Sequence, residues 1–136
     1  NFKYYNDKFG HGIGDLLLKK FASVLSKVIR SSDFIYRYGG DEFIIIALDV
    51  REPNPQRVVT RIRDELENAQ YFIPAIEEDL GEKINIKKEK LLGFSVGVCM
   101  NDPNSKSMDF EKMLQYADAA MYKAKEKGKN CTVLYD

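Results

Sequence analysis

The sequence predicts an α/β (α+β) fold with a central, mostly antiparallel sheet flanked by helices. Three segments repeat apolar residues at helical spacing, 14–30, 54–69 and 109–127, and shorter apolar segments of strand length lie between them. The predicted order of helix, strand, strand, helix, strand, helix, strand is typical of a layered domain. A chain of 136 residues with 44% apolar residues suits one such domain with a substantial core.

The first half of the chain is expected to pass from a loop through the first helix into a hairpin. Residues 6–14 hold three glycines in five residues, which is typical of a loop that enters a helix. Strand-like segments 34–38 and 43–48 flank Gly39-Gly40-Asp41-Glu42, so they predict a hairpin with a short turn. The second of them is apolar enough to be buried on both faces. Residues 1–5 are expected only as the tail of a strand before the first helix.

The second half begins with a helix whose start is marked by Asn54 and Pro55, an N-cap followed by proline at the first helical position. Residues 71–83 show no clear period, and residues 71–90 are either a functional insertion or, as favoured here, a long, charged loop. Three further segments are strand-like, at residues 84–88, 91–100 and 131–135. A loop is expected at 101–107, and Gly128 is expected to end the last helix.

Charge balance and cysteine usage exclude several classes of function. Lys+Arg and Asp+Glu are equal at 21 each, so no global field would collect nucleic acid or an anionic membrane. The chain has no apolar run long enough to span a membrane. Cys99 and Cys131 lie in apolar segments, which favours reduced, buried thiols and a cytoplasmic domain. Two distant cysteines and one histidine argue against a zinc site.

The strongest candidate for chemistry is the predicted turn, Gly39-Gly40-Asp41-Glu42. Two glycines without side chains let a phosphate chain approach the backbone closely, and carboxylates combined with substrate phosphates are typical ligands of Mg²⁺. Adjacent strand residues point to opposite faces, so Asp41 and Glu42 face one way only if the turn twists them. The alternative is an ordinary solvated turn, since Gly and Asp are common turn formers.

Two other groups of polar residues flank this turn in the sequence. Asn6 and Asp15 bracket the glycine-rich segment, and an amide together with a carboxylate can recognise guanine. Their alternative roles are a loop-forming Asn and a first-turn Asp favoured by the helix dipole. The second group surrounds Gly128 and is either a phosphate clamp or a solvated helix end: Lys123, Lys125, Lys127 and Lys129.

Four motifs together resemble the GGDEF domains, the diguanylate cyclases. Residues 37–43, Arg-Tyr-Gly-Gly-Asp-Glu-Phe, resemble the family signature. Residues 1–15 are similar to its Phe-Lys-x-x-Asn-Asp-x-x-Gly-His-x-x-Gly-Asp segment, and residues 94–98 to its Ser-x-Gly strand. Residues 117–125 resemble its Ala-Asp-x-Ala-x-Tyr-x-Ala-Lys helix, which Gly128-Lys129-Asn130 follows as in the family. The resemblance covers nearly the whole chain.

The resemblance implies a palm-like nucleotide-cyclase fold and a defined reaction. Members of the family condense two GTP into cyclic di-GMP and release two pyrophosphates. Each domain binds one GTP, and two domains face each other as a homodimer, so that the two-fold symmetry of the product mirrors that of the dimer. The cofactor implied is Mg²⁺ or Mn²⁺. Neither a nucleic-acid partner nor direct membrane contact is expected, although the parent protein can be membrane-tethered.

The resemblance also implies a role for each site residue. Asp41, with Glu42 second, would ligate metal and help to deprotonate the attacking 3′-hydroxyl. The implied substrate-binding residues are Phe2 and Lys3, through backbone amides to phosphate; Asn6 and Asp15, for guanine; Gly39 and Gly40, beside the phosphates; and Lys125 and Lys129, on phosphate. Lys129 stands where many members have Arg, which keeps the charge but loses bidentate geometry.

Arg30-x-x-Asp33 stands where the family has its product-binding inhibitory site, and Arg61 is placed where a second domain often contributes a contact. Arginine pairs bidentately with phosphate or stacks on guanine. The alternative for Arg30 and Asp33 is a helix-end salt bridge, which contributes little at a surface.

One departure from the family concerns the N-terminus. The family's first metal-binding Asp lies on a strand that ends just upstream of Asn1, and the chain begins without Met. Residues 1–136 are therefore expected to be a single GGDEF domain truncated at its N-terminus. That piece would lack one metal ligand and would by itself be a poor cyclase.

Three rival functions differ in class from an active cyclase. A catalytically silent GGDEF domain that senses GTP or cyclic di-GMP is the first, although silent members usually lose the carboxylates kept here. A palm-type polymerase is the second, and the neutral charge argues against it. A structural adaptor, the third, would not need guanine-reading residues and a carboxylate turn together.

Overall fold

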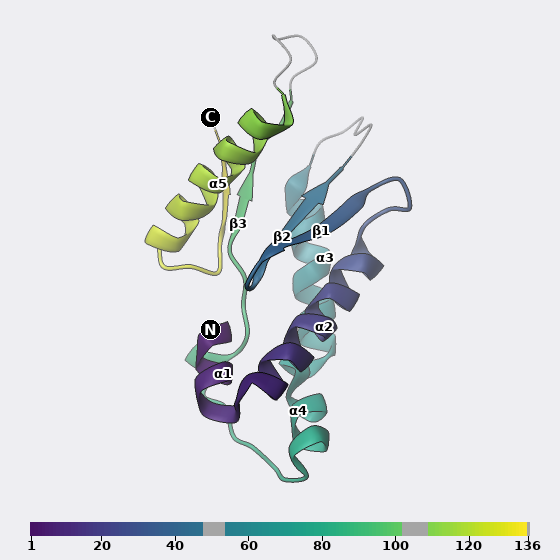
Figure 1. Ribbon diagram of the computed structural model, residues 1–136, viewed down its shortest axis with the longest axis vertical. Coiled ribbons are helices and arrows are strands. Elements are labelled where there is room, and N and C mark those ends of the chain that lie inside the picture. The colour runs from purple at the N-terminus through teal and green to yellow at the C-terminus, as the bar shows by residue number, and fades with distance from the viewer. Residues whose placement is uncertain (48–53, 102–108, 136) are drawn as a thin grey trace. The chain divides into compact units, whose positions relative to one another are not determined.

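The computed structural model describes residues 1–47, 54–101 and 109–135, and it has the predicted mixture of helices and sheet (Figure 1). Residue 48 of the second predicted strand and most of the predicted loop 101–107 lie outside these ranges. Within them, the strands form two pairs, one antiparallel and one parallel. None of the described helices is both long enough and apolar enough to cross a membrane.

The chain divides into two compact units, unit 1 from Asn1 to Leu92 and unit 2 from Gly93 to Asp136. Unit 1 begins with two consecutive helices, α1 (Phe2–Phe9) and α2 (His11–Val28), which are drawn in purple in Figure 1. Helix α2 is the longest element of this unit, and the other helices and the hairpin are arranged along it.

A single glycine separates α1 from α2. Gly10 has φ +91° and ψ 170°, a conformation that other residues rarely adopt, so the helix breaks here. The loop predicted over residues 6–14 is wrong, because Gly12 and Gly14 are helical and only Gly10 interrupts the helix. Residues 2–5 likewise form the first turn of α1 instead of the tail of a strand.

The predicted hairpin is confirmed. Strands β1 (Phe34–Gly39) and β2 (Glu42–Ile46) pair antiparallel. The register shifts between Arg37 and Gly39, which leaves Tyr38 as a bulge just before the turn. The prediction that the second strand is buried on both faces is wrong, since every residue of β2 is half-buried. Among the described residues, this sheet consists of two strands.

Helix α3 (Pro55–Asn68) begins as the sequence predicts. The Asn54 side chain accepts a hydrogen bond of 3.1 Å from the backbone N–H of Gln56, and Pro55 lies in the first turn. One face of α3 packs on α2 and buries three residues at helical spacing, Val59, Ile62 and Leu66.

The charged loop predicted for residues 71–90 is wrong over its first part, because the chain is helical as far as Leu80, and it holds for residues 81–87, which form neither helix nor strand. A 3₁₀ turn, η1 (Gln70–Phe72), leads into a further helix, α4 (Ile73–Leu80). Phe72 is 4% exposed and Ile76 is 0% exposed, so this segment contributes to the core of unit 1. Eight residues make little more than two helical turns, which is too short for a clear hydrophobic period.

The strand predicted over residues 84–88 is also wrong. The backbone N–H of Ile84 donates to Glu77 Oε2 at 3.0 Å, so α4 satisfies a group that a neighbouring strand would otherwise pair. Farther along, the chain forms a second 3₁₀ turn, η2 (Lys88–Lys90). Residues 70–92, which include both turns and α4, are called the extension below.

The core of unit 1 gathers around α2. Its buried apolar residues come from all four helices and the extension: Tyr5, Ile13, Leu17, Val24, Leu25, Val28, Val59, Ile62, Leu66, Phe72, Ile76 and Leu92. The hairpin packs on α2 as well, where the rings of Phe21 and Phe43 lie 5.8 Å apart.

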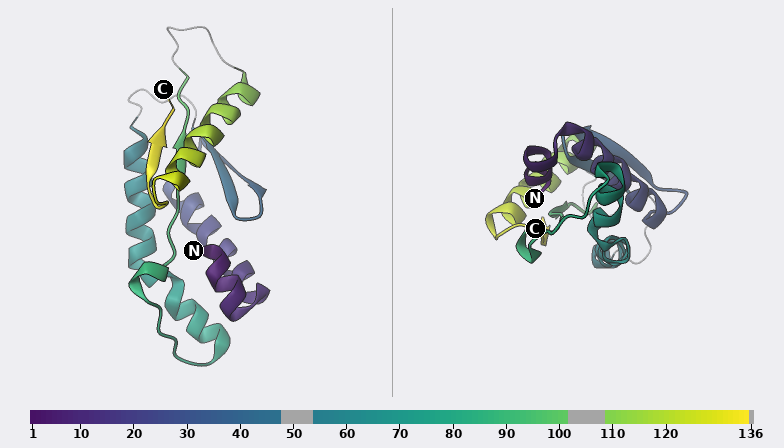
Figure 2. Two further views of the ribbon diagram at one scale, coloured as in Figure 1. Left: turned by 90° about the vertical axis from the view of Figure 1, so that its left-hand side faces the viewer. Right: turned by 90° about the horizontal axis from the view of Figure 1, so that it is seen from below.

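In unit 2, helix α5 (Phe110–Glu126) packs on the parallel strands β3 (Val96–Val98) and β4 (Thr132–Leu134), as Figures 1 and 2 show. Gly97 permits this close packing, because a Cβ at this position would overlap backbone atoms of α5. Both strands are shorter than the segments predicted for them, which were residues 91–100 and 131–135.

The ends of α5 agree with the sequence. The Asp109 side chain accepts a hydrogen bond of 2.8 Å from the N–H of Lys112, which caps the first turn. Gly128 follows the last turn with φ +107°. Cys99 and Cys131 are free, half-buried thiols, and burial raises the pKa of Cys99.

Candidate functional site

The hairpin turn consists of Gly40 and Asp41, with Gly40 at φ +36°. Arg37 holds this turn closed, because its Nε and Nη2 both donate to the carbonyl oxygen of Gly40, at 3.0 and 2.7 Å. The sequence prediction did not assign Arg37 a role, although it stands first in the Arg-Tyr-Gly-Gly-Asp-Glu-Phe motif. The guanidinium group fixes the backbone from which the two carboxylates project.

The turn offers two carboxylates beside open space. Asp41 is exposed and Glu42, the first residue of β2, is half-buried. A Cβ at Gly39 or at Gly40 would meet nothing within 4 Å, so a phosphate chain can approach this backbone. No group of three potential metal-ligating side chains occurs among the described residues. Two carboxylates on one turn do fit Mg²⁺ or Mn²⁺, provided that substrate phosphates and water supply the other ligands.

The structure brings Asn6 and Asp15, the predicted guanine-reading residues, close together through Gly14. Asn6 is half-buried on α1, and its carboxamide fills the space beside Gly14 so fully that a Cβ there would overlap Asn6 Oδ1. Asp15 is the next residue on α2 and is exposed. Gly14 is therefore required by the close approach of the Asn6 side chain.

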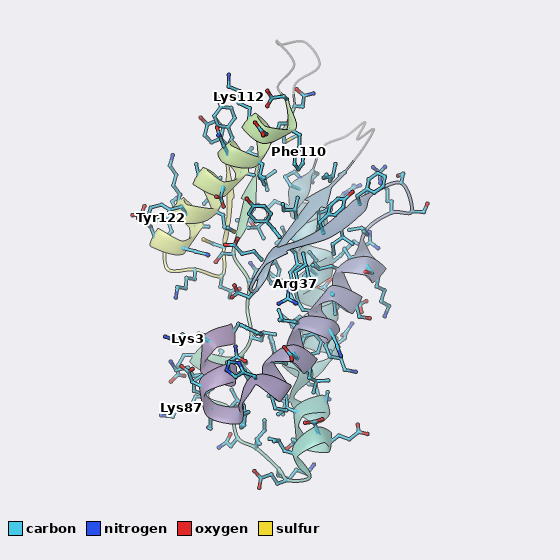
Figure 3. The ribbon with its side chains drawn as sticks, in the orientation of Figure 1. Lys3, Arg37, Lys87, Phe110, Lys112 and Tyr122 are labelled. Atoms are coloured by element: carbon cyan, nitrogen blue, oxygen red, sulfur yellow. The ribbon has the colours of Figure 1, made fainter. Side chains whose placement is uncertain are left out.

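Asp15 and the hairpin share one open hollow of about 490 Å³, which lies on the surface of α2. Its lining residues are Asp15, Leu18, Lys19, Ala22, Ser26, Ile35, Arg37 and Phe43. In Figure 3, Arg37 lies between the hairpin and α2. The volume is in the usual range for small-molecule sites, and the lining combines an apolar wall with a few charged groups, as such sites do.

Phe2 and Lys3 lie in the first turn of α1, where a helix has backbone N–H groups without intrahelical partners. Lys125 and Lys129 are exposed residues of unit 2, at the end of α5 and in the loop that follows it. These two predicted phosphate ligands therefore belong to unit 2, whereas the hairpin belongs to unit 1.

The loop that carries Lys129 is held in an unusual conformation. Gly128, Lys129 and Asn130 all have positive φ, at +107°, +65° and +50°. The Asn130 side chain accepts from the N–H of Phe94 at 3.4 Å, and the Asn130 N–H donates to Ser95 Oγ at 3.1 Å. Asn130 is another residue whose role the sequence prediction missed, although it follows the lysine in the quoted Gly-Lys-Asn segment.

Arg30 and Asp33 form a closed turn between α2 and β1. Asp33 accepts a hydrogen bond of 3.0 Å from the N–H of Arg30, and the guanidinium of Arg30 lies 3.3 Å from the same carboxylate. The helix-end salt bridge that the sequence allowed is therefore present. The Arg30 side chain remains 52% exposed, and Arg61, on α3, is exposed.

The family of this chain follows from its similarity to known proteins. Residues 1–131 match the sequence model of the GGDEF family, described as diguanylate cyclase, GGDEF domain. The chain is 36% identical over 134 residues to diguanylate cyclase DosC of Escherichia coli K12, covering 98% of this chain and 26% of that protein. It is 34% identical over 132 residues to response regulator PleD of Caulobacter vibrioides, covering 97% of this chain and 26% of that protein. The chain thus spans about a quarter of these relatives.

Solved structures show the same fold. The active GGEEF domain of a diguanylate cyclase from Vibrio cholerae superposes with a TM-score of 0.65 at 27% identity, covering 100% of this chain and 77% of that chain. The GGDEF domain of DgcB from Caulobacter crescentus, in complex with c-di-GMP, gives a TM-score of 0.62 at 25% identity, covering 98% of this chain and 71% of that chain. This chain belongs to the GGDEF domain family of diguanylate cyclases.

Proposed function

We propose that the protein containing this chain is a diguanylate cyclase, which condenses two GTP into cyclic di-GMP and releases two pyrophosphates. One observation carries the proposal: Asp15, which adjoins Asn6 through Gly14, shares a single hollow with the hairpin that bears Asp41 and Glu42. The hollow is lined by Asp15 of α2 and by Ile35, Arg37 and Phe43 of the hairpin. A guanine nucleotide held at Asp15 would therefore lie beside the strands that lead to the carboxylate turn.

The two parts of the proposed site would have different chemical roles. Asn6 and Asp15 would bind guanine, since a carboxylate accepts from N1 and N2 and an amide donates to a ring acceptor. Mg²⁺ or Mn²⁺ held by Asp41 and Glu42 would neutralise phosphate charge. Asp41 would accept the proton of the 3′-hydroxyl of one GTP. The oxygen of that hydroxyl would form a bond to the α-phosphorus of the second GTP, and the bond from this phosphorus to pyrophosphate would break. A second, identical step closes the ring.

The test uses the full-length protein with GTP and Mg²⁺, and chromatography of the products. We expect cyclic di-GMP and pyrophosphate from the wild type and none from Asp41→Ala, with circular dichroism showing that the variant is folded. Asp79→Ala, which removes another exposed carboxylate outside the site, is the matched control and should retain activity. Nucleotide binding without any turnover by the wild type would instead support the silent, sensing type of GGDEF domain.

We also propose that Arg30 and Asp33 bind the product and inhibit the enzyme, with Arg61 of a second domain contributing. The support is a half-exposed guanidinium beside a fixed carboxylate, which suits phosphate and guanine respectively. Calorimetric titration of the full-length protein with cyclic di-GMP should show binding that Arg30→Ala abolishes and that Arg57→Ala, another exposed arginine, leaves intact. Equal binding by all three proteins would rule this site out.

A further inference from the structure

Helix α1 and its N-cap residue are hydrogen-bonded to one short segment of the extension. The hydroxyl of Tyr5 donates to the carbonyl oxygen of Lys90 at 2.8 Å. Asn1 Nδ2 donates to the carbonyl oxygens of Glu89 and Leu91, each at 3.0 Å. These three acceptors are consecutive carbonyls of the turn at residues 89–91. An eight-residue helix has little stability of its own, so such contacts determine where its axis lies.

Additional contacts reinforce this attachment. The ammonium group of Lys90 lies 5.4 Å from the centre of the Tyr4 ring, and the Tyr4 and Tyr5 rings meet edge to face at 5.4 Å. Figure 3 shows Lys3, on α1, and Lys87, just before the turn, along the same edge of unit 1. The extension thus contacts the helix that carries the predicted phosphate-binding and guanine-binding residues.

Tyr5 is the buried centre of the attachment. Its side chain is 0% exposed, and burial raises its pKa to about 12, with the neighbouring Tyr4 adding to the shift. The phenol therefore stays protonated and donates its hydrogen bond throughout the physiological pH range. Deleting the hydroxyl leaves the carbonyl of Lys90 without this donor, while the ring still fills its place in the core.

Asn6, the next residue, is held on a different side of the helix. Its carboxamide lies against Gly14 of α2, where not even a methyl group would fit. Successive residues on a helix point about 100° apart, so Tyr5 and Asn6 can contact different neighbours at once. A shift of α1 at Tyr5 must therefore move the Asn6 carboxamide relative to Asp15.

We propose that Tyr5 is a positioning residue for guanine binding, which acts by fastening α1 to the turn at residues 89–91 and so holding Asn6 in register with Asp15. On this proposal, the extension holds α1, the helix that carries Asn6, in position. The inference rests on the proposed function, because it assumes that Asn6 binds the guanine of GTP.

The experiment compares Tyr5→Phe with Tyr4→Phe in the full-length protein. Both changes remove one hydroxyl from α1, but that of Tyr4 pairs with Lys8 on the same helix, so Tyr4→Phe is the matched control. The dissociation constant of a non-hydrolysable GTP analogue should rise roughly threefold to tenfold in Tyr5→Phe, as expected for the loss of one hydrogen bond, and stay unchanged in the control. The KM for GTP should rise while kcat changes little, because only binding is affected.

A double-mutant cycle separates positioning from general loss of stability. If Tyr5 acts through Asn6, adding Tyr5→Phe to Asn6→Ala should weaken binding no further. Asn1→Ala, which removes the two other hydrogen bonds to the same turn, should reproduce the effect of Tyr5→Phe. Thermal unfolding without nucleotide confirms that each variant is folded at the assay temperature.

Each outcome distinguishes the inference from the function it rests on. If Asn6→Ala leaves the affinity for the GTP analogue unchanged, the guanine-binding role of Asn6 is wrong and the proposed site fails. If Asn6→Ala weakens binding but Tyr5→Phe does not, the site stands and the positioning role of Tyr5 is overturned. Fully additive effects of the two changes would also overturn it.

Discussion

Gly12 and Gly14 stand two residues apart on α2 but have opposite surroundings. A Cβ at Gly14 would overlap the Asn6 carboxamide, whereas one at Gly12 would meet nothing within 4 Å. We expect Gly14→Ala to lower the free energy of unfolding by about 1–3 kcal/mol through overpacking and to weaken GTP binding. Gly12→Ala should instead raise it by up to about 1 kcal/mol, since alanine favours a helix.

Urea unfolding and titration with a GTP analogue measure both effects. Gly12→Ala is the matched control, because it makes the same chemical change one-half turn earlier on the helix. Equal stability and equal GTP affinity in the two variants would contradict the close contact between Asn6 and Gly14.

Tyr5 also predicts a dependence of stability on alkaline pH. The folded-state pKa is raised from 10.0 to about 12, chiefly by burial. Between these values the unfolded chain releases the phenolic proton while the folded chain keeps it, so stability falls as the pH rises. The decrease attributable to Tyr5 is roughly 2 kcal/mol. Urea unfolding of the wild type and Tyr5→Phe at several pH values between 9 and about 12 should give curves that converge as the pH rises; parallel curves would exclude the raised pKa.

At the scale of elements, the contact between α5 and β3 depends on Gly97. A Cβ there would overlap the carbonyl oxygen of Ala117 and the N–H of Met121, which are backbone atoms of α5 and cannot rotate away. Gly97→Ala should therefore push the helix off the strands and lower the free energy of unfolding by about 3 kcal/mol or more. Loss of the N-cap in Asp109→Ala should lower it by only about 1 kcal/mol.

Chemical unfolding of both variants provides the measurement, with the Asp109 change at the start of α5 as the comparison. If Gly97→Ala proves no more destabilising than Asp109→Ala, then α5 and β3 are not in the close contact described above. The comparison is informative because one change tests packing and the other tests only the end of the helix.

At the scale of the whole molecule, the proposed reaction requires two domains. The resemblance to the family implies that each domain holds one GTP, so that neither domain would complete the product alone. The specific activity of the full-length protein should therefore rise with protein concentration and level off once the dimer predominates. Rate measurements together with light scattering at the same concentrations test this expectation. A constant specific activity across a range in which the protein is monomeric would contradict it.

Several parts of this protein were determined by local sequence alone. The hairpin, the Asn54 cap with Pro55 and the C-terminal helix all follow from spacing and capping within a few residues, and the structure confirms them. The family also follows from short motifs, which occur in order along nearly the whole chain. These features were predictable because neighbouring residues satisfy most of the interactions that define them.

Other parts were decided only by the tertiary structure. The sequence alone did not show which of three nearby glycines breaks the helix. In the structure, Gly14 leaves room for the Asn6 side chain, whereas Gly10 supplies the positive φ. The helical extension escaped prediction because its burial comes from contacts with α2 and α3 and not from a long period of its own.

The same is true of the candidate site. Sequence named Asn6, Asp15 and the hairpin turn, but only the folded chain places Asp15 and the hairpin around one hollow. The bond from Tyr5 to the carbonyl of Lys90 joins residues 85 positions apart. The type of a residue and its local spacing determine what chemistry it can perform. Packing between distant segments determines which of those residues meet, because the backbone carbonyls and small cavities involved carry no signature in the sequence.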